Sequence, residues 1–153
     1  MHFIDTHAHV YAEELTSDLD LIMKNAVSVG VNKIIMPAID SSTLEAMLKV
    51  EQQFPEHCIA MMGLHPCYVK ENYKEELKLV EEWIGKRKFI AIGEIGLDFY
   101  WDKTFAKEQH IVFETQMQWA LDLHLPIAIH TRNAMGETIE AVKPFAKQNV
   151  FEA

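Results

Sequence analysis

The stretch that decides the fold is "FIAIGEIGLD", residues 89–98. It begins as an apolar run with β-branched residues and ends in two carboxylates, Glu94 and Asp98. Apolar runs of this length are typical of parallel strands that are buried on both faces. The two acids at its carboxyl end therefore indicate a strand that leads into a polar site.

Four other apolar runs occur in the chain, and three of them also lead into polar residues. The runs cover residues 2–5, 33–38, 58–66 and 125–132. The first leads into His7 and His9, the third ends at His65 before a proline, and the last carries His130 followed by Arg132. The residues "NVFEA" at 149–153 are predicted to begin a sixth strand.

Amphipathic segments separate these runs and predict helices at residues 17–30, 41–54, 74–86, 104–124 and 136–147. In the second of them, Ser42 and Glu45 have the spacing of a helix-capping box. Strands that alternate with helices predict an α/β fold with right-handed crossovers, either a doubly wound sheet or a (β/α)₈ barrel. The 153 residues are enough for one ordinary core, so we expect a single domain over 1–153.

The polar residues after the runs are expected to meet, because the carboxyl ends of parallel strands lie on one side of a sheet. Strand alternation would point Asp5, His7 and His9 the same way. Imidazoles and carboxylates together suit Zn²⁺, Mn²⁺ or Mg²⁺. Glu94 has two oxygens and could bridge two ions, while Asp5 could orient a ligand histidine.

Composition excludes several classes of protein. The net charge of −9 argues against a nucleic-acid binder that relies on a basic surface. No run reaches the roughly 18 apolar residues of a membrane span, and the first residues lack the pattern of a signal peptide, so we expect a cytoplasmic protein without membrane contact. Cys58 and Cys67 are too few for a disulfide framework.

Four motifs resemble, in order and spacing, the TatD family of metal-dependent deoxyribonucleases. They are "DTHAHV" (5–10), "GLHP" (63–66), "GEIGLDFY" (93–100) and "QHIVFETQMQWALDLHLPIAIHTR" (109–132). That family belongs to the amidohydrolase-like barrels. The resemblance implies a partial TIM (β/α)₈-type barrel, here about five βα units plus the start of a sixth strand. It also implies hydrolysis of phosphodiester bonds in DNA.

The resemblance implies roles for individual residues. His7 and His9 would bind a first divalent ion, Glu94 would bridge two ions, and His130 would bind the second. Glu94, Asp98 and Arg132 are the expected catalytic residues, and Asp5 and His65 would lie near the substrate or behind the ligands. The family takes two further ligands from its sixth and eighth strands, so we expect weakened metal affinity and low activity in this chain. Its open barrel edges are expected to be covered in a homo-oligomer.

Two other functions stay open at this stage. Small-molecule amidohydrolases share the His-x-His barrel, but many use a lysine modified by CO₂ at the end of the fourth strand. Glu94 stands at that place here, which favours the nuclease. A third possibility is an inactive chain that acts only in assembly.

Overall fold

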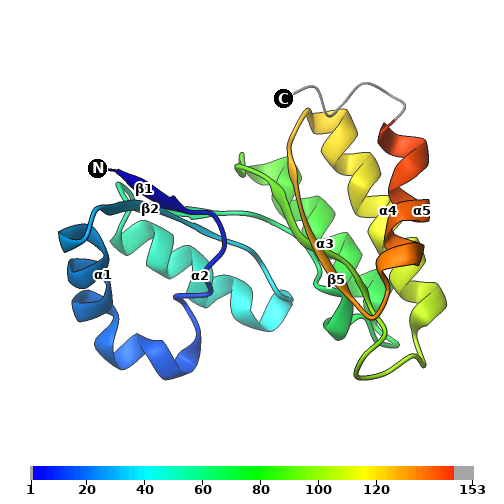
Figure 1. Ribbon diagram of the computed structural model, residues 1–153, viewed down its shortest axis with the longest axis horizontal. Helices are drawn as coiled ribbons and strands as arrows, with labels where there is room; N and C mark the ends of the chain where they lie inside the picture. The colour runs from blue at the N-terminus through cyan, green and yellow to red at the C-terminus, as the bar shows by residue number, and fades with distance from the viewer. Residues whose placement is uncertain (1, 147–153) are drawn as a thin grey trace.

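The computed structural model describes residues 2–146, in which strands and helices alternate from the first residue to the last (Figure 1). The strands are β1 (Phe3–Asp5), β2 (Val31–Met36), β3 (Cys58–Ala60), β4 (Ile92–Asp98) and β5 (Ile127–Arg132). The helices are α1 (Leu19–Ser28), α2 (Ser41–Gln53), α3 (Tyr73–Lys86), α4 (Ala106–Leu123) and α5 (Met135–Ala146), with short 3₁₀ turns at Glu13–Asp18 and Pro66–Tyr68. The predicted start of a sixth strand at 149–153 lies outside the described residues.

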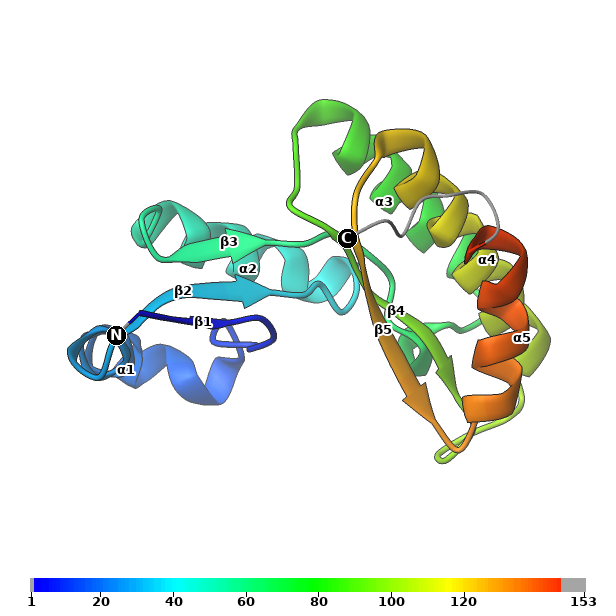
Figure 2. The same ribbon diagram turned by 45° about the horizontal axis from the view of Figure 1, so that its top comes forward.

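The strands run parallel and form two sets, β1-β2-β3 and β4-β5, each in chain order (Figure 2). β2 pairs with β1 and β3, and β4 pairs with β5. A parallel bridge between Met62 and Ile92 joins the two sets of strands. This order is that of a (β/α)₈ barrel, whereas a doubly wound sheet reverses its order at a switch point. The predicted α/β partial barrel is therefore confirmed.

Burial differs between the centre and the edges of this curved sheet. All seven residues of β4 are buried, as the apolar run predicts. The same prediction is wrong for β1, whose residues are all exposed, and for β5, where none is fully buried. Each of these two strands has a neighbour on one side only among the described residues. The expectation that a second copy of the chain covers these edges stays a prediction.

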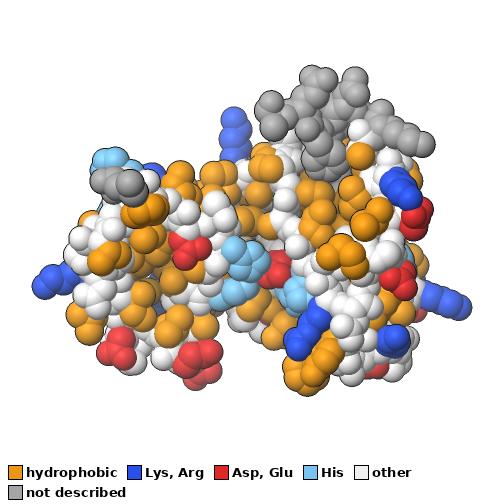
Figure 3. All heavy atoms as spheres, viewed as in Figure 1, with side chains coloured by type: hydrophobic (Ala, Val, Ile, Leu, Met, Phe, Trp, Pro, Cys, Tyr) orange, Lys and Arg blue, Asp and Glu red, His pale blue; other side chains and the backbone are white. Residues whose placement is uncertain are grey.

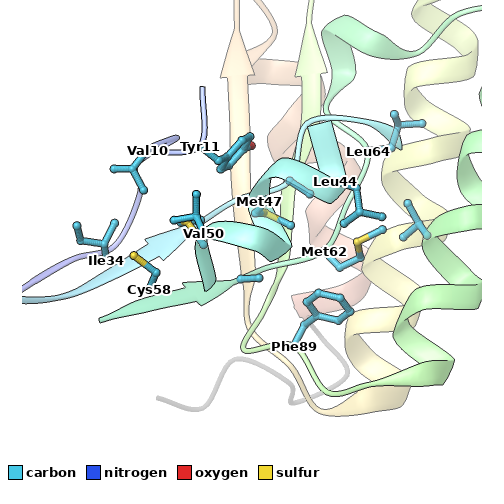
Figure 4. Packing of buried hydrophobic residues seen from close by; sticks show 14 of the residues in the cluster. Val10, Tyr11, Ile34, Leu44, Met47, Val50, Cys58, Met62, Leu64 and Phe89 are labelled. Carbon is cyan, nitrogen blue, oxygen red and sulfur yellow. The ribbon is translucent and has the colours of Figure 1, made fainter. Parts of the chain in front are cut away.

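The core consists of two apolar clusters. In the first, Leu44, Met47 and Val50 on one face of α2 pack against β2 and β3 (Figure 4). In the second, β4 packs against Phe113 and Met117 of α4. These clusters hold the helices on the sheet and leave the carboxyl ends of the strands free.

Two buried glutamines of α4 hold the loop after β3 and the end of β4. Gln116 accepts a hydrogen bond from the amide of Leu64 at 2.7 Å and donates to the Leu64 carbonyl at 3.2 Å. Gln109 does the same for Asp98, with distances of 2.9 and 3.1 Å. A buried backbone group without a partner costs about 1–3 kcal/mol, so each glutamine stabilises the segment whose amide and carbonyl it pairs.

The start of α2 corrects the predicted capping box. Asp40 is the N-cap residue, and its carboxylate accepts hydrogen bonds from the amides of Ser42 and Thr43 at 3.0 and 3.2 Å. Thr43 rather than Glu45 completes the box, since its hydroxyl lies 3.4 Å from the Asp40 amide. Among the described helices, none has the length and apolar character needed to cross a membrane.

Gly96 is required where β4 passes β5. Its φ is +146°, and a Cβ atom there would lie 1.9 Å from the carbonyl oxygen of His130. We predict that Gly96→Ala lowers the free energy of unfolding by about 2–6 kcal/mol through clash and backbone strain. Urea denaturation checks this. The matched control is Gly85→Ala in α3, where a Cβ meets nothing within 4 Å and a gain of up to about 1 kcal/mol is expected. Equal denaturation midpoints for the two variants would contradict the prediction.

Candidate metal centre

The histidines and acids singled out in the sequence gather where the carboxyl ends of the strands meet. Figure 3 shows pale blue histidine side chains beside a red acidic side chain in the middle of one face. They come from the loop after β1, the loop after β3, and from β4 and β5 themselves. Residues far apart in the sequence thus share one mouth, as parallel strands require.

The Glu94 carboxylate is the centre of this cluster. Its side chain is 9% exposed, and nitrogens of four histidines surround it. His7 Nε2 and His9 Nε2 lie 3.0 and 3.5 Å from Oε2. His130 Nδ1 and His65 Nε2 lie 3.0 and 3.7 Å from Oε1. One carboxylate oxygen therefore faces each pair of imidazoles.

Tyr11 orients His9, a role that sequence reasoning missed. The Tyr11 hydroxyl donates to the carbonyl of Pro37 at 2.5 Å and lies 2.8 Å from His9 Nδ1. Since the hydroxyl proton is used on the carbonyl, Nδ1 of His9 is the donor of the second bond. The lone pair of Nε2 is then directed at Glu94, as a metal ligand requires. Tyr11 continues the alternation of Asp5, His7 and His9, a signal that could have revealed it.

Asp98 orients His130 in the same manner. Its Oδ2 accepts from His130 Nε2 at 2.8 Å, which leaves Nδ1 facing Glu94. His65 is held by its neighbour, because its Nδ1 accepts from the amide of Cys67 at 3.1 Å. His65 Nε2 lies 3.2 Å from His130 Nδ1. Each of the two imidazoles that face Oε1 of Glu94 is therefore held by a hydrogen bond at its other ring nitrogen.

The loop after β1 departs from the expected geometry. β1 ends at Asp5, so strand alternation does not extend to His7 and His9. Asp5 accepts a hydrogen bond from the backbone amide of His7 at 3.0 Å rather than orienting an imidazole. It shapes the loop, and the loop brings both histidines to the same oxygen of Glu94.

The cluster shifts the acid–base properties of its members. Burial tends to raise the pKa of Glu94, but His130 and His9, together with the nearby His65 and His7, hold it well below its usual range. For His130, the hydrogen bond to Glu94 raises the pKa. Burial lowers the pKa of His65 to about 4. At neutral pH, Glu94 is therefore ionised and His65 is uncharged.

Two groups of donors could hold a metal ion. His7, His9 and Glu94 offer ligand atoms within 4.8 Å of one another, and so do His65, Cys67 and His130. Nitrogen and carboxylate oxygen suit Zn²⁺ and Mn²⁺, and a sulfur donor adds preference for Zn²⁺. A buried carboxylate between oriented imidazoles fits a cation, because the positive charge offsets the burial of the anion.

Arg132 and two aromatic residues, Tyr100 and Trp101, lie at the edge of the site. The Arg132 guanidinium lies 3.8 Å from the ring centre of Tyr100 and 5.1 Å from that of Trp101. A hollow of about 490 Å³ opens beside them and is lined also by His9 and His130. Of the residues predicted from the sequence, this hollow is lined by His9, His65, Asp98, His130 and Arg132, whereas Asp5, His7 and Glu94 are not among its lining residues.

Comparisons with known proteins found a matching family and several relatives. Residues 4–152 match the model of the family described as TatD related DNase. A relative from Bacillus subtilis (strain 168), named an uncharacterized metal-dependent hydrolase, is 32% identical over 91% of this chain and 54% of its own length. A relative from Erwinia tasmaniensis, named a 3'-5' ssDNA/RNA exonuclease, is 26% identical over 92% of this chain and 54% of its own. The chain thus spans about half the length of these curated relatives.

Solved structures have the same fold. The TatD homolog YjjV from Escherichia coli superimposes with a TM-score of 0.85 at 28% identity, over 93% of this chain and 55% of that one. A hydrolase of the TatD family from Entamoeba histolytica superimposes with a TM-score of 0.77 at 22% identity, which supports the fold alone.

Cation binding should depend on Glu94. We predict that Glu94→Gln weakens Mn²⁺ binding by about 10–100-fold or more, since the amide removes the charge between the imidazoles. Isothermal titration calorimetry measures the affinity. Glu82→Gln, an exposed acid of α3, is the matched control and should bind as the wild type does. Equal affinities for both variants would contradict a metal centre at Glu94.

Cation binding should also weaken as the pH falls. The hydrogen bond to Glu94 raises the pKa of His130, so its protonated form persists above the ordinary value of about 6.5. A proton on His130 Nδ1 excludes an ion from that nitrogen. The affinity for Mn²⁺ should therefore already fall as the pH decreases through values above 6.5, and His130→Asn should flatten this dependence. A profile that is flat in the wild type would contradict it.

Proposed function

Because this chain belongs to the family of TatD-related DNases, we propose that it acts as a metal-dependent hydrolase that cleaves phosphodiester bonds of DNA. The observation that carries the proposal is the buried Glu94 carboxylate with imidazoles of four histidines around it. The names of relatives, metal-dependent hydrolase and 3'-5' ssDNA/RNA exonuclease, support the same chemistry.

In this proposal, His7, His9 and Glu94 hold one divalent ion, and Glu94 and His130 hold a second. When bound, divalent ions activate water and stabilise the charge of the phosphate group. Glu94 places the two sites next to each other, because each of its oxygens faces a different pair of histidines. His65 and Asp98 support His130 from two sides.

Arg132 is proposed to bind a phosphate oxygen at the edge of the site. Its planar guanidinium suits phosphate and lines the same hollow as His9 and His130. The acidic chain needs such local positive charge, since its net charge of −9 repels a polyanion at longer range. Bound ions and Arg132 together would supply it.

Glu94 favours this reaction over hydrolysis of small amides or lactones. A modified lysine is expected at the end of the fourth strand in many amidohydrolases, whereas β4 carries Glu94 as its third residue and ends in Asp98.

An oligonucleotide assay tests this function. With Mn²⁺ present, single-stranded DNA should be cleaved, EDTA should stop the cleavage, and His7→Ala should reduce it by at least about tenfold through loss of a ligand. His2→Ala is the matched control, because His2 lies before β1 and contacts Asn32 rather than Glu94. Cleavage that survives EDTA or His7→Ala would contradict the proposal, as would turnover of lactones or amides without turnover of DNA.

A further inference from the structure

The loop after β4 exposes two neighbouring aromatic side chains. Trp101 is 71% exposed and Tyr100 is 50% exposed. Trp83 and Trp119, the other tryptophans of the chain, are partly buried and pack against the core. Leaving a large apolar ring in water is unfavourable, so an exposed tryptophan at the rim of a cavity indicates a binding surface.

These rings are held in a defined arrangement. The centres of Tyr100 and Trp101 lie 4.7 Å apart with an angle of 86° between the ring planes. The guanidinium of Arg132 lies 3.8 Å from the Tyr100 ring centre. A cation over an aromatic ring contributes about 0.5–1 kcal/mol at exposed sites. The three side chains therefore form a pre-organised surface, which is here named the aromatic rim.

The aromatic rim is connected to the metal centre through Asp98. The Asp98 Oδ1 atom accepts from the amide of Tyr100 at 3.0 Å and, more weakly, from that of Trp101 at 3.5 Å. Its Oδ2 atom accepts from His130 Nε2 at 2.8 Å. The buried carboxylate thus fixes the start of the loop relative to the imidazole beside Glu94. This places the rings at a constant position relative to the reactive site.

The rim and the metal centre also share a hollow. Trp101 and Arg132 line it together with His9, His65 and His130. A phosphodiester seated at the histidines would leave its neighbouring nucleoside beside the rim. Aromatic side chains bind bases by stacking, and this is worth about 1–3 kcal/mol per base and tolerates any base.

We propose that the aromatic rim is a stacking site for one unpaired nucleobase next to the scissile phosphodiester, with Trp101 as the stacking ring. This inference rests on the proposed function. Bases inside a duplex are stacked on both faces, so only an unpaired or terminal nucleotide offers a free face. The rim therefore selects single-stranded nucleic acid, without preference for a base sequence. Arg132 supports the rings and lies within reach of the adjoining phosphate.

The first test compares the binding of oligonucleotides that do and do not carry bases. Fluorescence anisotropy measures the affinity of the chain, with Mn²⁺ and without, for labelled oligothymidine, for an abasic strand of equal length and for a duplex. Trp101→Ala should weaken binding of oligothymidine by about 5–150-fold and leave binding of the abasic strand unchanged. Trp101→Phe should retain most of the affinity. Phe3→Ala, which removes an exposed aromatic ring of β1, is the matched control and should bind as the wild type does.

The second test observes the ring itself. In a Trp83→Phe, Trp119→Phe background, Trp101 is the only tryptophan. Oligothymidine should quench its fluorescence and protect it from acrylamide, and the abasic strand should do neither. A change that follows protein concentration instead of added oligonucleotide would mean that a second copy covers the ring, which overturns the proposal.

The outcomes separate this inference from the proposed function. Base-dependent binding that requires Trp101, without cleavage of any strand, would support the rim while the hydrolase proposal failed. Equal affinity for oligothymidine and the abasic strand, or for single strand and duplex, would overturn the rim even if DNA is cleaved. Loss of affinity for the abasic strand in Trp101→Ala would also overturn it, because the ring would then act on the backbone or on folding.

Discussion

The burial of one carboxylate governs the architecture of this molecule. Glu94 lies on the most buried strand, and an ionised acid there costs several kcal/mol unless positive or donating groups surround it. Histidines from two loops and a neighbouring strand meet that need, with nitrogens 3.0–3.7 Å from its oxygens. The strand order β1 to β5 is what allows segments so distant in sequence to reach one side chain. Because the buried Glu94 carboxylate is stabilised by nearby positive charge, the same site suits cations.

The rest of the fold keeps this arrangement rigid. Gly96 allows β4 to approach His130 closely, and Gln109 and Gln116 tie the strand ends to α4. Asp98 and Tyr11 each hold one imidazole in a defined tautomer. Such supporting contacts decide whether ligands lie within a few tenths of an ångström of a useful position. The helix α4 and the strand β4 therefore contribute both to the core and to the site.

Sequence patterns predicted the carboxyl ends of β4 and β5, at Asp98 and Arg132. They were less accurate for β3, which ends at Ala60 although the apolar run continues to residue 66, and Glu94 lies inside β4 rather than at its end. The position of His7 and His9 was harder, since β1 stops at Asp5 and a loop rather than strand alternation directs them. The cap of α2 was misplaced because Asp40 precedes the residues with the capping spacing. Gln109 and Gln116 had a readable signal, as polar residues seven apart on an apolar helix face.

The aromatic rim and the metal centre are proposed to bind different parts of a nucleotide. The acidic chain repels a polyanion at a distance, so attraction has to come from short-range contacts inside one mouth. In the proposed function, cations at the histidines and Arg132 would act on phosphate, which all nucleic acids share. The proposed stacking on Trp101 would act on the free face of a base, which a duplex hides. Asp98 joins the two, since one of its oxygens holds the imidazole of His130 and the other holds the aromatic loop. A single buried carboxylate thus sets the distance between the place where the phosphate would react and the place where its base would rest.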